Sequence, residues 1–186
     1  MGPLWIGPGW EVPPPDALAV VIEPARAFGT GGHPTTRLCL ELLVGLRSRL
    51  GAASVLDVGC GSGVLAVAAW RLGYRPARAM DVDPAAVEET RRNAAANQAS
   101  VEVSLADVLA ADLPFADVAV ANIARETVEA LAARLRCRFL VASGYVDTDP
   151  PELAGFRHLR RRAADGWAAD LYAPEELSTR SRHSLV

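Results

Sequence analysis

Short apolar runs alternate along this chain with longer segments whose apolar residues recur at helical spacing. The runs at 53–58, 77–83, 101–105, 117–121 and 139–142 have the length of buried strands. Helices are expected from Thr35 or Thr36, as the cap, to about Leu50, from Val64 to Leu72, from Pro84 onward and from Arg125 to Arg136. Strands that alternate with helices predict an α/β fold with a largely parallel sheet.

The carboxyl-terminal third follows a different pattern. Two strand-like runs, Phe156 to Ala163 and Trp167 to Tyr172, are separated by Ala164-Asp165-Gly166, and an Asp-Gly pair favours a tight hairpin turn. The chain therefore predicts seven strands, five alternating with helices and the last two paired as an antiparallel hairpin. A further short strand is expected at Val20 to Glu23.

Length and composition indicate one domain. The chain has 186 residues, 51% of them hydrophobic, which is enough for one well-formed core. Residues 1–16 are rich in proline and glycine and are interpreted as a linker or extended lead-in, residues 17–173 as the domain, and residues 174–186 as a polar, disordered tail.

Charge and cysteine content exclude several classes of protein. A net charge of −3 without a basic run argues against a general nucleic-acid binder, and the arginines at 157, 160, 161 and 162 are interpreted as a solvated edge strand. Three cysteines, at 39, 60 and 137, show no metal-ligand spacing, so we expect reduced thiols and no metal. Without a membrane-span pattern or a signal-peptide layout, a cytoplasmic protein is expected.

The first strand of the core runs directly into Asp57-Val58-Gly59-Cys60-Gly61-Ser62-Gly63. Glycines at this point let a ligand approach the backbone closely. Their Gly-x-Gly-x-Gly spacing differs from the Gly-x-Gly-x-x-Gly of a dinucleotide fold, so a ligand without a pyrophosphate, such as S-adenosylmethionine, is favoured over NAD.

Three further strands each end at a residue suited to such a ligand. Asp81 can accept hydrogen bonds from ribose hydroxyls, Asp107 can meet an adenine amino group, and Asn122 follows the fourth strand. Open parallel sheets bind their ligands at the carboxyl ends of the strands, where these residues are expected to meet.

Together these features resemble the class I S-adenosylmethionine-dependent methyltransferases, whose fold is Rossmann-like. Within them, the run from Ile22 to Thr36, the glycine loop, Asp81-Val82-Asp83-Pro84 and Val120-Ala121-Asn122-Ile123 resemble the PrmA family of ribosomal protein methyltransferases, over about residues 4–172. The chain departs from that family at Ala25-Arg26, where a glycine and an apolar residue are usual. The family's members resemble a two-domain protein whose amino-terminal domain grips the ribosomal substrate, and this sequence is expected to begin at the linker that follows that domain.

The resemblance implies a cofactor, S-adenosyl-L-methionine, and a protein substrate that carries a reactive amine. It implies cofactor contacts at Thr36, Gly59, Asp81 and Asn122. With the positions found from the residues themselves, the expected set of cofactor contacts is Thr36, Asp57, Gly59, Gly61, Gly63, Asp81, Asp107 and Asn122.

Methyl transfer to an amine is a direct displacement that depends on alignment more than on acid–base catalysis. Asn122 is expected at the methyl-transfer end, where its side-chain oxygen can hold the amine. Phe28 and His33 are candidate substrate contacts, although a loop histidine is more often a capping or packing residue.

Three interpretations remain open. The favoured one is a protein amine methyltransferase, with a lysine side chain or an amino-terminal amine as acceptor. A free-standing methyltransferase for a small molecule or another protein, and a non-catalytic cofactor-binding scaffold, are the alternatives. No nucleic-acid or membrane partner is expected, and the sequence does not specify an oligomeric state.

Overall fold

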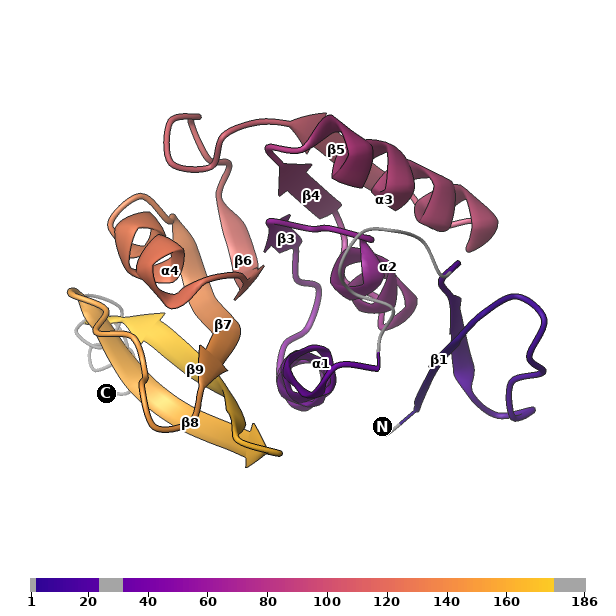
Figure 1. The fold of residues 1–186 in the computed structure, drawn as a ribbon, viewed down its shortest axis with the longest axis horizontal. Coiled ribbons are helices and arrows are strands. Elements are labelled where there is room, and N and C mark those ends of the chain that lie inside the picture. The colour runs from indigo at the N-terminus through magenta and orange to yellow at the C-terminus, as the bar shows by residue number, and fades with distance from the viewer. Residues whose placement is uncertain (1–2, 24–31, 176–186) are drawn as a thin grey trace, which may run out of the picture.

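The computed structural model describes residues 3–23 and 32–175 and is built around a seven-stranded sheet (Figure 1). The strands are ordered β5-β4-β3-β6-β7-β9-β8, the first five parallel and β9 antiparallel to both of its neighbours. Their bounds are β3 Val55–Val58, β4 Ala77–Asp81, β5 Val101–Leu105, β6 Ala116–Asn122, β7 Cys137–Val146, β8 Phe156–Ala164 and β9 Trp167–Pro174. The predicted fold class and the terminal hairpin are confirmed.

Helices cover both faces of this sheet. The helices α1 (Pro34–Arg47), α2 (Val64–Arg71) and α3 (Pro84–Ala96) lie on one face, and α4 (Arg125–Ala132) lies on the other (Figure 1). Along β6, Val118 and Val120 pack towards α1 and α2, whereas Ala119 and Ala121 pack towards α4. Burial on both faces explains why this strand is apolar from Val118 to Ala121, which is typical of a parallel sheet.

The start of α1 corrects one prediction. His33, and neither Thr35 nor Thr36, is the N-cap residue, because its imidazole Nδ1 accepts a hydrogen bond from the backbone N–H of Thr35 at 3.3 Å. Pro34 occupies the first helical position, where its missing N–H costs nothing. Both threonines are therefore placed inside the first turn, where they are fully buried. Two helices also end earlier than predicted, α1 at Arg47 and α4 at Ala132.

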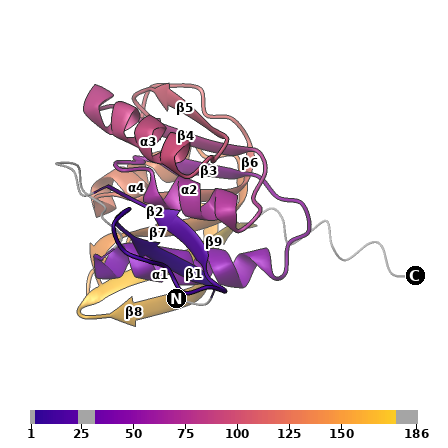
Figure 2. The ribbon, with the colours of Figure 1, turned by 90° about the vertical axis from the view of Figure 1, so that its right-hand side faces the viewer.

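A second, two-stranded parallel sheet precedes the main one. It consists of β1 (Leu4–Gly7) and β2 (Leu18–Val21), and Figure 2 shows it beside α2. Asn97, at the end of α3, attaches β2 by bonding both the N–H and the carbonyl of Val21, at 2.8 and 2.6 Å. Residues 1–16, expected as a lead-in, thus contain a strand, and the strand predicted at 20–23 begins two residues earlier.

The hairpin is held by a fully buried carboxylate. Arg161 of β8 donates two hydrogen bonds of 2.8 Å to Asp170 of β9, which also accepts from the hydroxyl of Tyr145 and contacts the ring nitrogen of His158. The edge position of β8 is confirmed, but Arg161 is engaged with a buried partner instead of being solvated. This network fixes the hairpin, and Trp167, the first residue of β9, belongs to the site described below.

The described ranges contain three buried free cysteines. They hold no group of three histidine, cysteine or acidic residues able to ligate a metal ion, and none of their helices is long and apolar enough to cross a membrane.

Candidate functional site

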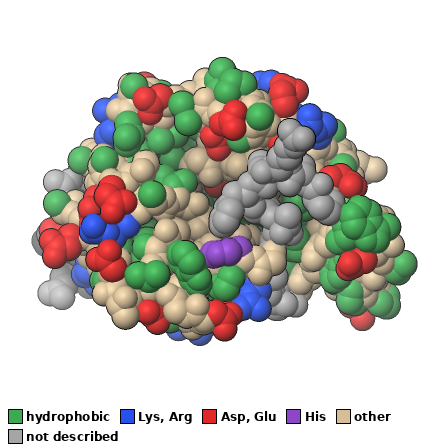
Figure 3. All heavy atoms as spheres, viewed as in Figure 1, with side chains coloured by type: hydrophobic (Ala, Val, Ile, Leu, Met, Phe, Trp, Pro, Cys, Tyr) green, Lys and Arg blue, Asp and Glu red, His purple; other side chains and the backbone are tan. Residues whose placement is uncertain are grey.

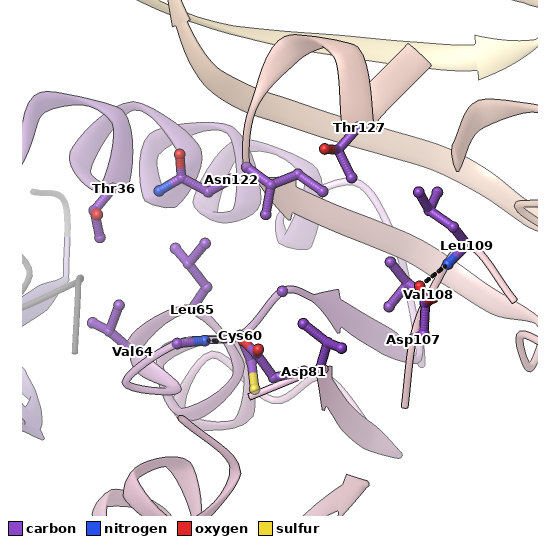
Figure 4. Close-up of a pocket in the computed structure, with 14 residues that line it drawn as sticks. Thr36, Cys60, Val64, Leu65, Asp81, Asp107, Val108, Leu109, Asn122 and Thr127 are labelled. Carbon is purple, nitrogen blue, oxygen red and sulfur yellow. Dashed lines mark hydrogen bonds between the residues drawn. The ribbon is translucent and has the colours of Figure 1, made fainter. Parts of the chain in front are cut away.

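A cavity of about 570 Å³ lies at the carboxyl ends of the parallel strands. Six predicted cofactor contacts line it: Thr36, Gly59, Gly61, Asp81, Asp107 and Asn122. Figure 4 shows Thr36 and Asn122 along one wall, Asp81 and Cys60 opposite them, and Asp107 with Val108 and Leu109 at the end remote from Thr36. Residues 86 positions apart in the sequence therefore share one elongated cavity, at the edge where the strand pattern predicted it.

The glycine loop forms the floor of the cavity by close backbone packing. Gly59 has a φ of +74°, and a Cβ at this position would lie 2.4 Å from Cγ2 of Ile123, which follows β6. Any larger residue would have to push the loop or Ile123 into the cavity. Glycine is required here both for the backbone conformation and for the approach of the two strand ends.

Asp81 shapes this loop from the neighbouring strand. Its Oδ2 accepts a hydrogen bond from the N–H of Gly61 at 2.9 Å, and its Oδ1 accepts one from the N–H of Asp83 at 3.0 Å. Each carboxylate oxygen has a second lone pair that can accept a hydroxyl from a ligand. Asp107 is held in a similar way, because its Oδ1 accepts the N–H of Leu109 at 2.9 Å.

Among the residues that the structure describes, two buried oxygens in the wall of the cavity have no hydrogen-bond partner: Oγ1 of Thr36 and Oδ1 of Asn122. Buried polar atoms are nearly always paired, and leaving one unpaired costs about 1–3 kcal/mol. Thr36 and Asn122 therefore present groups whose hydrogen-bonding capacity a ligand can satisfy.

Two predicted contacts, Asp57 and Gly63, do not line the cavity. Asp57 is buried behind the glycine loop, where its Oδ2 accepts the N–H of Ala66 at 3.0 Å. Burial, with Asp81 nearby, raises the pKa of this carboxyl to about 7. Gly63 is the N-cap of α2 and packs against Thr90, whose Cγ2 would lie 2.7 Å from an added Cβ. The structure thus makes both residues supports of the loop.

A second cavity, of about 340 Å³, adjoins the first, since Asn122 and Ile123 line both. His33, Thr35, Ala124, Gly144 and Trp167 complete its lining. The imidazole of His33 meets the indole of Trp167 edge to face, with ring centroids 4.9 Å apart. His33 thus both caps α1 and contributes to a cavity next to Asn122, whereas Phe28 lies outside the described residues.

Gly144 permits the close approach that forms this second cavity. Its φ is +105°, and a Cβ there would lie 2.1 Å from the carbonyl oxygen of Ile123. The pairing between β7 and β9 shifts register between Ser143 and Tyr145, which is typical of a β-bulge at a functional edge.

Sequence reasoning missed the apolar and aromatic part of the site. The cavities are also lined by Cys60, Val64, Leu65, Val82, Val108, Leu109, Ile123 and Thr127 in the first, and by Thr35, Gly144 and Trp167 in the second. Val82 and Val108 directly follow the two acids that were identified, so position after a strand end was an available signal. No local signal marked Trp167, which reaches the site only through the hairpin.

The charged side chains in the described lining of the first cavity are all acidic. Asp81 and Asp107 are the only ionisable acids in its described lining, and that lining includes no arginine or histidine. Figure 3 shows both acidic and basic side chains around the hollow on this face of the molecule, so the single sign of charge belongs to the lining alone. The site therefore favours a ligand that carries positive charge.

A seven-stranded sheet with this strand order, a glycine loop after β3 and acids after β4 and β5 define a class I methyltransferase domain. The model of the family described as "Ribosomal protein L11 methyltransferase (PrmA)" matches residues 1–148. The chain belongs to this family.

Individual relatives agree with this assignment. The chain is 48% identical over 137 residues to the ribosomal protein L11 methyltransferase of Edwardsiella ictaluri, covering 72% of this chain and 46% of that protein. It is 44% identical over 159 residues to the Aeromonas hydrophila protein of the same name, covering 81% and 53%. The chain spans about half the length of the curated relatives it matches.

Solved structures show the same fold. The crystal structure of a ribosomal protein L11 methylase from Lactobacillus delbrueckii subsp. bulgaricus superposes with a TM-score of 0.83 at 28% identity, covering 94% of this chain and 96% of that one. A putative methyltransferase, yhhF, from Escherichia coli has a TM-score of 0.63 at 20% identity, covering 74% and 86%, and supports the fold alone.

Proposed function

We propose that this chain is an S-adenosylmethionine-dependent methyltransferase that transfers methyl groups to amines of a ribosomal protein, a lysine side chain or an amino-terminal amine. The observation that carries the proposal is Asn122, whose unpartnered Oδ1 is in the lining of both a long acid-lined cavity and a second, aromatic-walled one. Two adjoining cavities that share one polar residue suit a reaction between two bound molecules.

The first cavity fits the cofactor in size, charge and polar groups. Its volume of about 570 Å³ lies within the range of pockets that take molecules of this size. Asp81 would hold the ribose hydroxyls, and Asp107 the adenine amino group between the side chains of Val82, Val108 and Leu109. Gly59, Gly61 and Thr36 would face the amino-acid portion. When bound, S-adenosylmethionine supplies a methyl group made electrophilic by its sulfonium.

Asn122 would hold the acceptor. Its Oδ1 can accept an N–H from a neutral amine, which turns the nitrogen lone pair away from Asn122 and into the first cavity. Alignment of the reacting atoms is the main contribution that a protein makes to such a displacement. Because Oδ1 has no partner among the described residues, an amine that binds there would satisfy a group that they leave buried and unpaired.

The second cavity would receive the chain that carries the amine. Trp167 and Ile123 offer apolar surface for the methylenes of a lysine side chain, and His33 and Thr35 add polar groups. An incoming ammonium must lose its proton before it reacts, and an imidazole such as that of His33 has the chemistry of a proton acceptor. We assign His33 to substrate contact, with proton acceptance as a secondary role that mutation can separate.

A ribosomal protein substrate is supported by the names of the relatives, which include "Ribosomal protein L11 methyltransferase". Such a substrate places the enzyme in the cytoplasm. The same proposal includes the remaining site assignments, with Asp57 and Gly63 as supports of the cofactor loop and Phe28 as a substrate contact. It also includes the division of the chain into a lead-in at 1–16, a domain at 17–173 and a tail at 174–186.

The test has two parts. Calorimetric titration with S-adenosylmethionine and, separately, with NAD examines the cofactor, and transfer of labelled methyl groups to purified ribosomal protein L11 examines the acceptor. The chain contains no lysine, so label recovered in methyl-lysine must come from the substrate. We expect saturable binding of S-adenosylmethionine alone, and labelled methyl-lysine or a labelled amino terminus in the substrate.

Each part can fail separately. Binding without transfer to ribosomal protein L11 would retain the cofactor and refute the acceptor. Binding of neither cofactor would refute the proposed activity of this chain and favour a scaffold.

A further inference from the structure

One face of α3 carries a row of three buried polar side chains, Thr90, Asn93 and Asn97, which are 0%, 2% and 1% exposed. Residues three and four positions apart on a helix lie one above the other, so these side chains follow the helix axis. None of the three is in the described lining of the first cavity. Buried polar groups are nearly always paired, and the partners of this polar row lie in two separate parts of the fold.

At one end, the polar row binds carbonyl groups of the glycine loop. The hydroxyl of Thr90 donates to the carbonyl oxygen of Gly61 at 2.9 Å. Nδ2 of Asn93 donates to the carbonyl oxygen of Ser62 at 2.8 Å. Gly61 has a φ of +54°, and a glycine by itself accepts many other backbone conformations. Bonds from α3, together with the one from Asp81 to the N–H of Gly61, therefore hold the loop in the conformation that lines the cavity.

At the other end, the polar row binds β2. Oδ1 of Asn97 accepts the N–H of Val21 at 2.8 Å, and its Nδ2 donates to the carbonyl oxygen of Val21 at 2.6 Å. The same Nδ2 donates to the backbone carbonyl of Asn93 at 2.8 Å. Oδ1 of Asn93 accepts the N–H of Glu23 at 3.4 Å. Asn93 is therefore bonded both to the glycine loop and to the segment that follows β2.

The polar row thus joins two parts of the fold that do not share a sheet. Within the described ranges, β1 and β2 pair only with each other and form no ladder with the main sheet. If β2 shifts, it must break its bonds to Asn97 or move Asn97 and Asn93 with it. Because Asn93 also holds the carbonyl of Ser62, such a movement reaches the glycine loop.

We propose that Asn93 and Asn97 are positioning residues for the cofactor, which couple the β1–β2 sheet to the glycine loop. Attachment of β2 then strengthens cofactor binding, and a bound cofactor strengthens the attachment of β2, since coupling between two sites is reciprocal. The inference rests on the proposed use of S-adenosylmethionine, and adds that the affinity for it depends on a sheet outside the cavity. Asparagines that only stabilised the fold would leave the affinity of the folded chain unchanged.

The first experiment measures cofactor affinity by calorimetric titration of the whole chain with S-adenosylmethionine. Asn97→Ala removes both bonds to Val21 and leaves the bonds from Thr90 and Asn93 to the glycine loop in place. We expect this variant to bind S-adenosylmethionine about fivefold more weakly or worse, as is typical of coupled sites. Asn93→Ala should weaken binding at least as much. Adding Asn97→Ala to Asn93→Ala should then change little, because the link is already broken.

The matched control is Ser54→Ala, which removes a buried polar side chain at the other end of β3 from the glycine loop. The hydroxyl of Ser54 donates to the carboxylate of Asp117 at 2.9 Å and accepts the N–H of Asp117 at 2.8 Å. This variant should lose stability as the asparagine variants do, yet bind S-adenosylmethionine as the unmodified chain does. Titrations are made where urea denaturation shows each variant to be folded.

The second experiment measures the coupling in the reverse direction by hydrogen exchange at the N–H of Val21. S-adenosylmethionine should slow this exchange in the unmodified chain. In Asn93→Ala the slowing should be lost, although both bonds between Asn97 and Val21 remain. The ligand is supplied at the same multiple of each chain's Kd, so that it stabilises both folds equally against global unfolding. Each experiment depends on a different variant, so if one variant does not fold, the other experiment decides.

The expected result is weaker binding in Asn97→Ala than in Ser54→Ala, and loss of the slowing at Val21 in Asn93→Ala. An affinity for S-adenosylmethionine that is the same in Asn97→Ala, in Ser54→Ala and in the unmodified chain would overturn the inference and leave the proposed function intact. Slowing at Val21 that persists in Asn93→Ala would overturn it as well. Failure of the unmodified chain to bind S-adenosylmethionine would refute the proposed function itself.

Discussion

Replacing Gly144 with alanine tests whether the wall between the two cavities depends on close backbone packing. Gly144 has a φ of +105°, and an alanine Cβ would lie 2.1 Å from the carbonyl oxygen of Ile123 and 2.9 Å from its nitrogen. Real Cβ atoms are essentially never closer than 3.0 Å to such atoms, so the strand end must move by about 1 Å. Asn122 is the residue immediately before Ile123 and must move with it.

The expected loss of stability has two parts. Forcing an L-residue into this backbone conformation costs about 1–3 kcal/mol, and displacing packed backbone costs about 1–3 kcal/mol more. We expect Gly144→Ala to lower the free energy of unfolding by about 4 kcal/mol. The matched control is Gly155→Ala, because Gly155 has a φ of +77° with nothing within 4 Å of an added Cβ, so only the conformational cost of about 1–2 kcal/mol remains.

Urea denaturation followed by circular dichroism measures both variants. A transition midpoint for Gly144→Ala well below that of Gly155→Ala, at unchanged slope, is the expected result. Equal losses of unfolding free energy in the two variants would show that contact between the added Cβ and Ile123 does not destabilise the fold, and would refute the packing argument. Turnover of the folded fraction should also fall in Gly144→Ala alone, because only this variant displaces Asn122.

Three further predictions concern individual side chains. Asp81→Ala should weaken S-adenosylmethionine binding by at least tenfold in calorimetry, because it removes the proposed ribose acceptor and frees the N–H of Gly61. The control, Asp83→Ala, should mainly lower the free energy of unfolding by about 1 kcal/mol, because it removes the N-cap of α3. Equal affinities for S-adenosylmethionine in the two variants would contradict the assignment of Asp81. Asn122→Ala should lower kcat more than it weakens cofactor binding, since its oxygen is proposed to hold the amine, and a loss confined to cofactor affinity would make it a binding residue only. Arg161→Met should lower the free energy of unfolding by about 3 kcal/mol, because it leaves the fully buried Asp170 without its bidentate partner. The exposed Arg160→Met should change it by less than about 1 kcal/mol. An equally small change in Arg161→Met would show that Tyr145 and His158 are enough to stabilise the Asp170 carboxylate.

Much of the fold could be predicted because its determinants are local. The apolar runs predicted all seven strands of the main sheet, and Asp165-Gly166 predicted the hairpin turn, in which both residues have positive φ. The N-cap of α1 was assigned to the wrong residue, because threonine is a common N-cap and histidine is not. The N-cap is His33, because its side chain reaches the backbone N–H of Thr35.

The residues of the candidate site also fall into those that the sequence indicates and those that only the structure shows. Asp81, Asp107, Asn122 and the glycine loop could be found in the sequence, because each stands at a strand end and parallel strands bring their carboxyl ends to one edge. Asp57 was predicted as a contact from its place in the motif, but strand alternation turns its side chain behind the loop. Only the register of β3 against its neighbours shows that this carboxyl is buried without a counter-charge.

The sequence by itself determined the class of fold, the edge of the sheet at which the first cavity lies and most of the polar groups there, since all of these follow from the order of elements along the chain. Only the tertiary structure decided that Trp167 and Gly144 meet His33 beside Asn122 to form a second cavity. It also decided that two oxygens in the wall of the first cavity, Oγ1 of Thr36 and Oδ1 of Asn122, have no partner within the described ranges. The physical reason is that His33 lies more than 100 positions before Gly144 and Trp167 in the sequence, so their distance is set by the packing of helix, sheet and hairpin together.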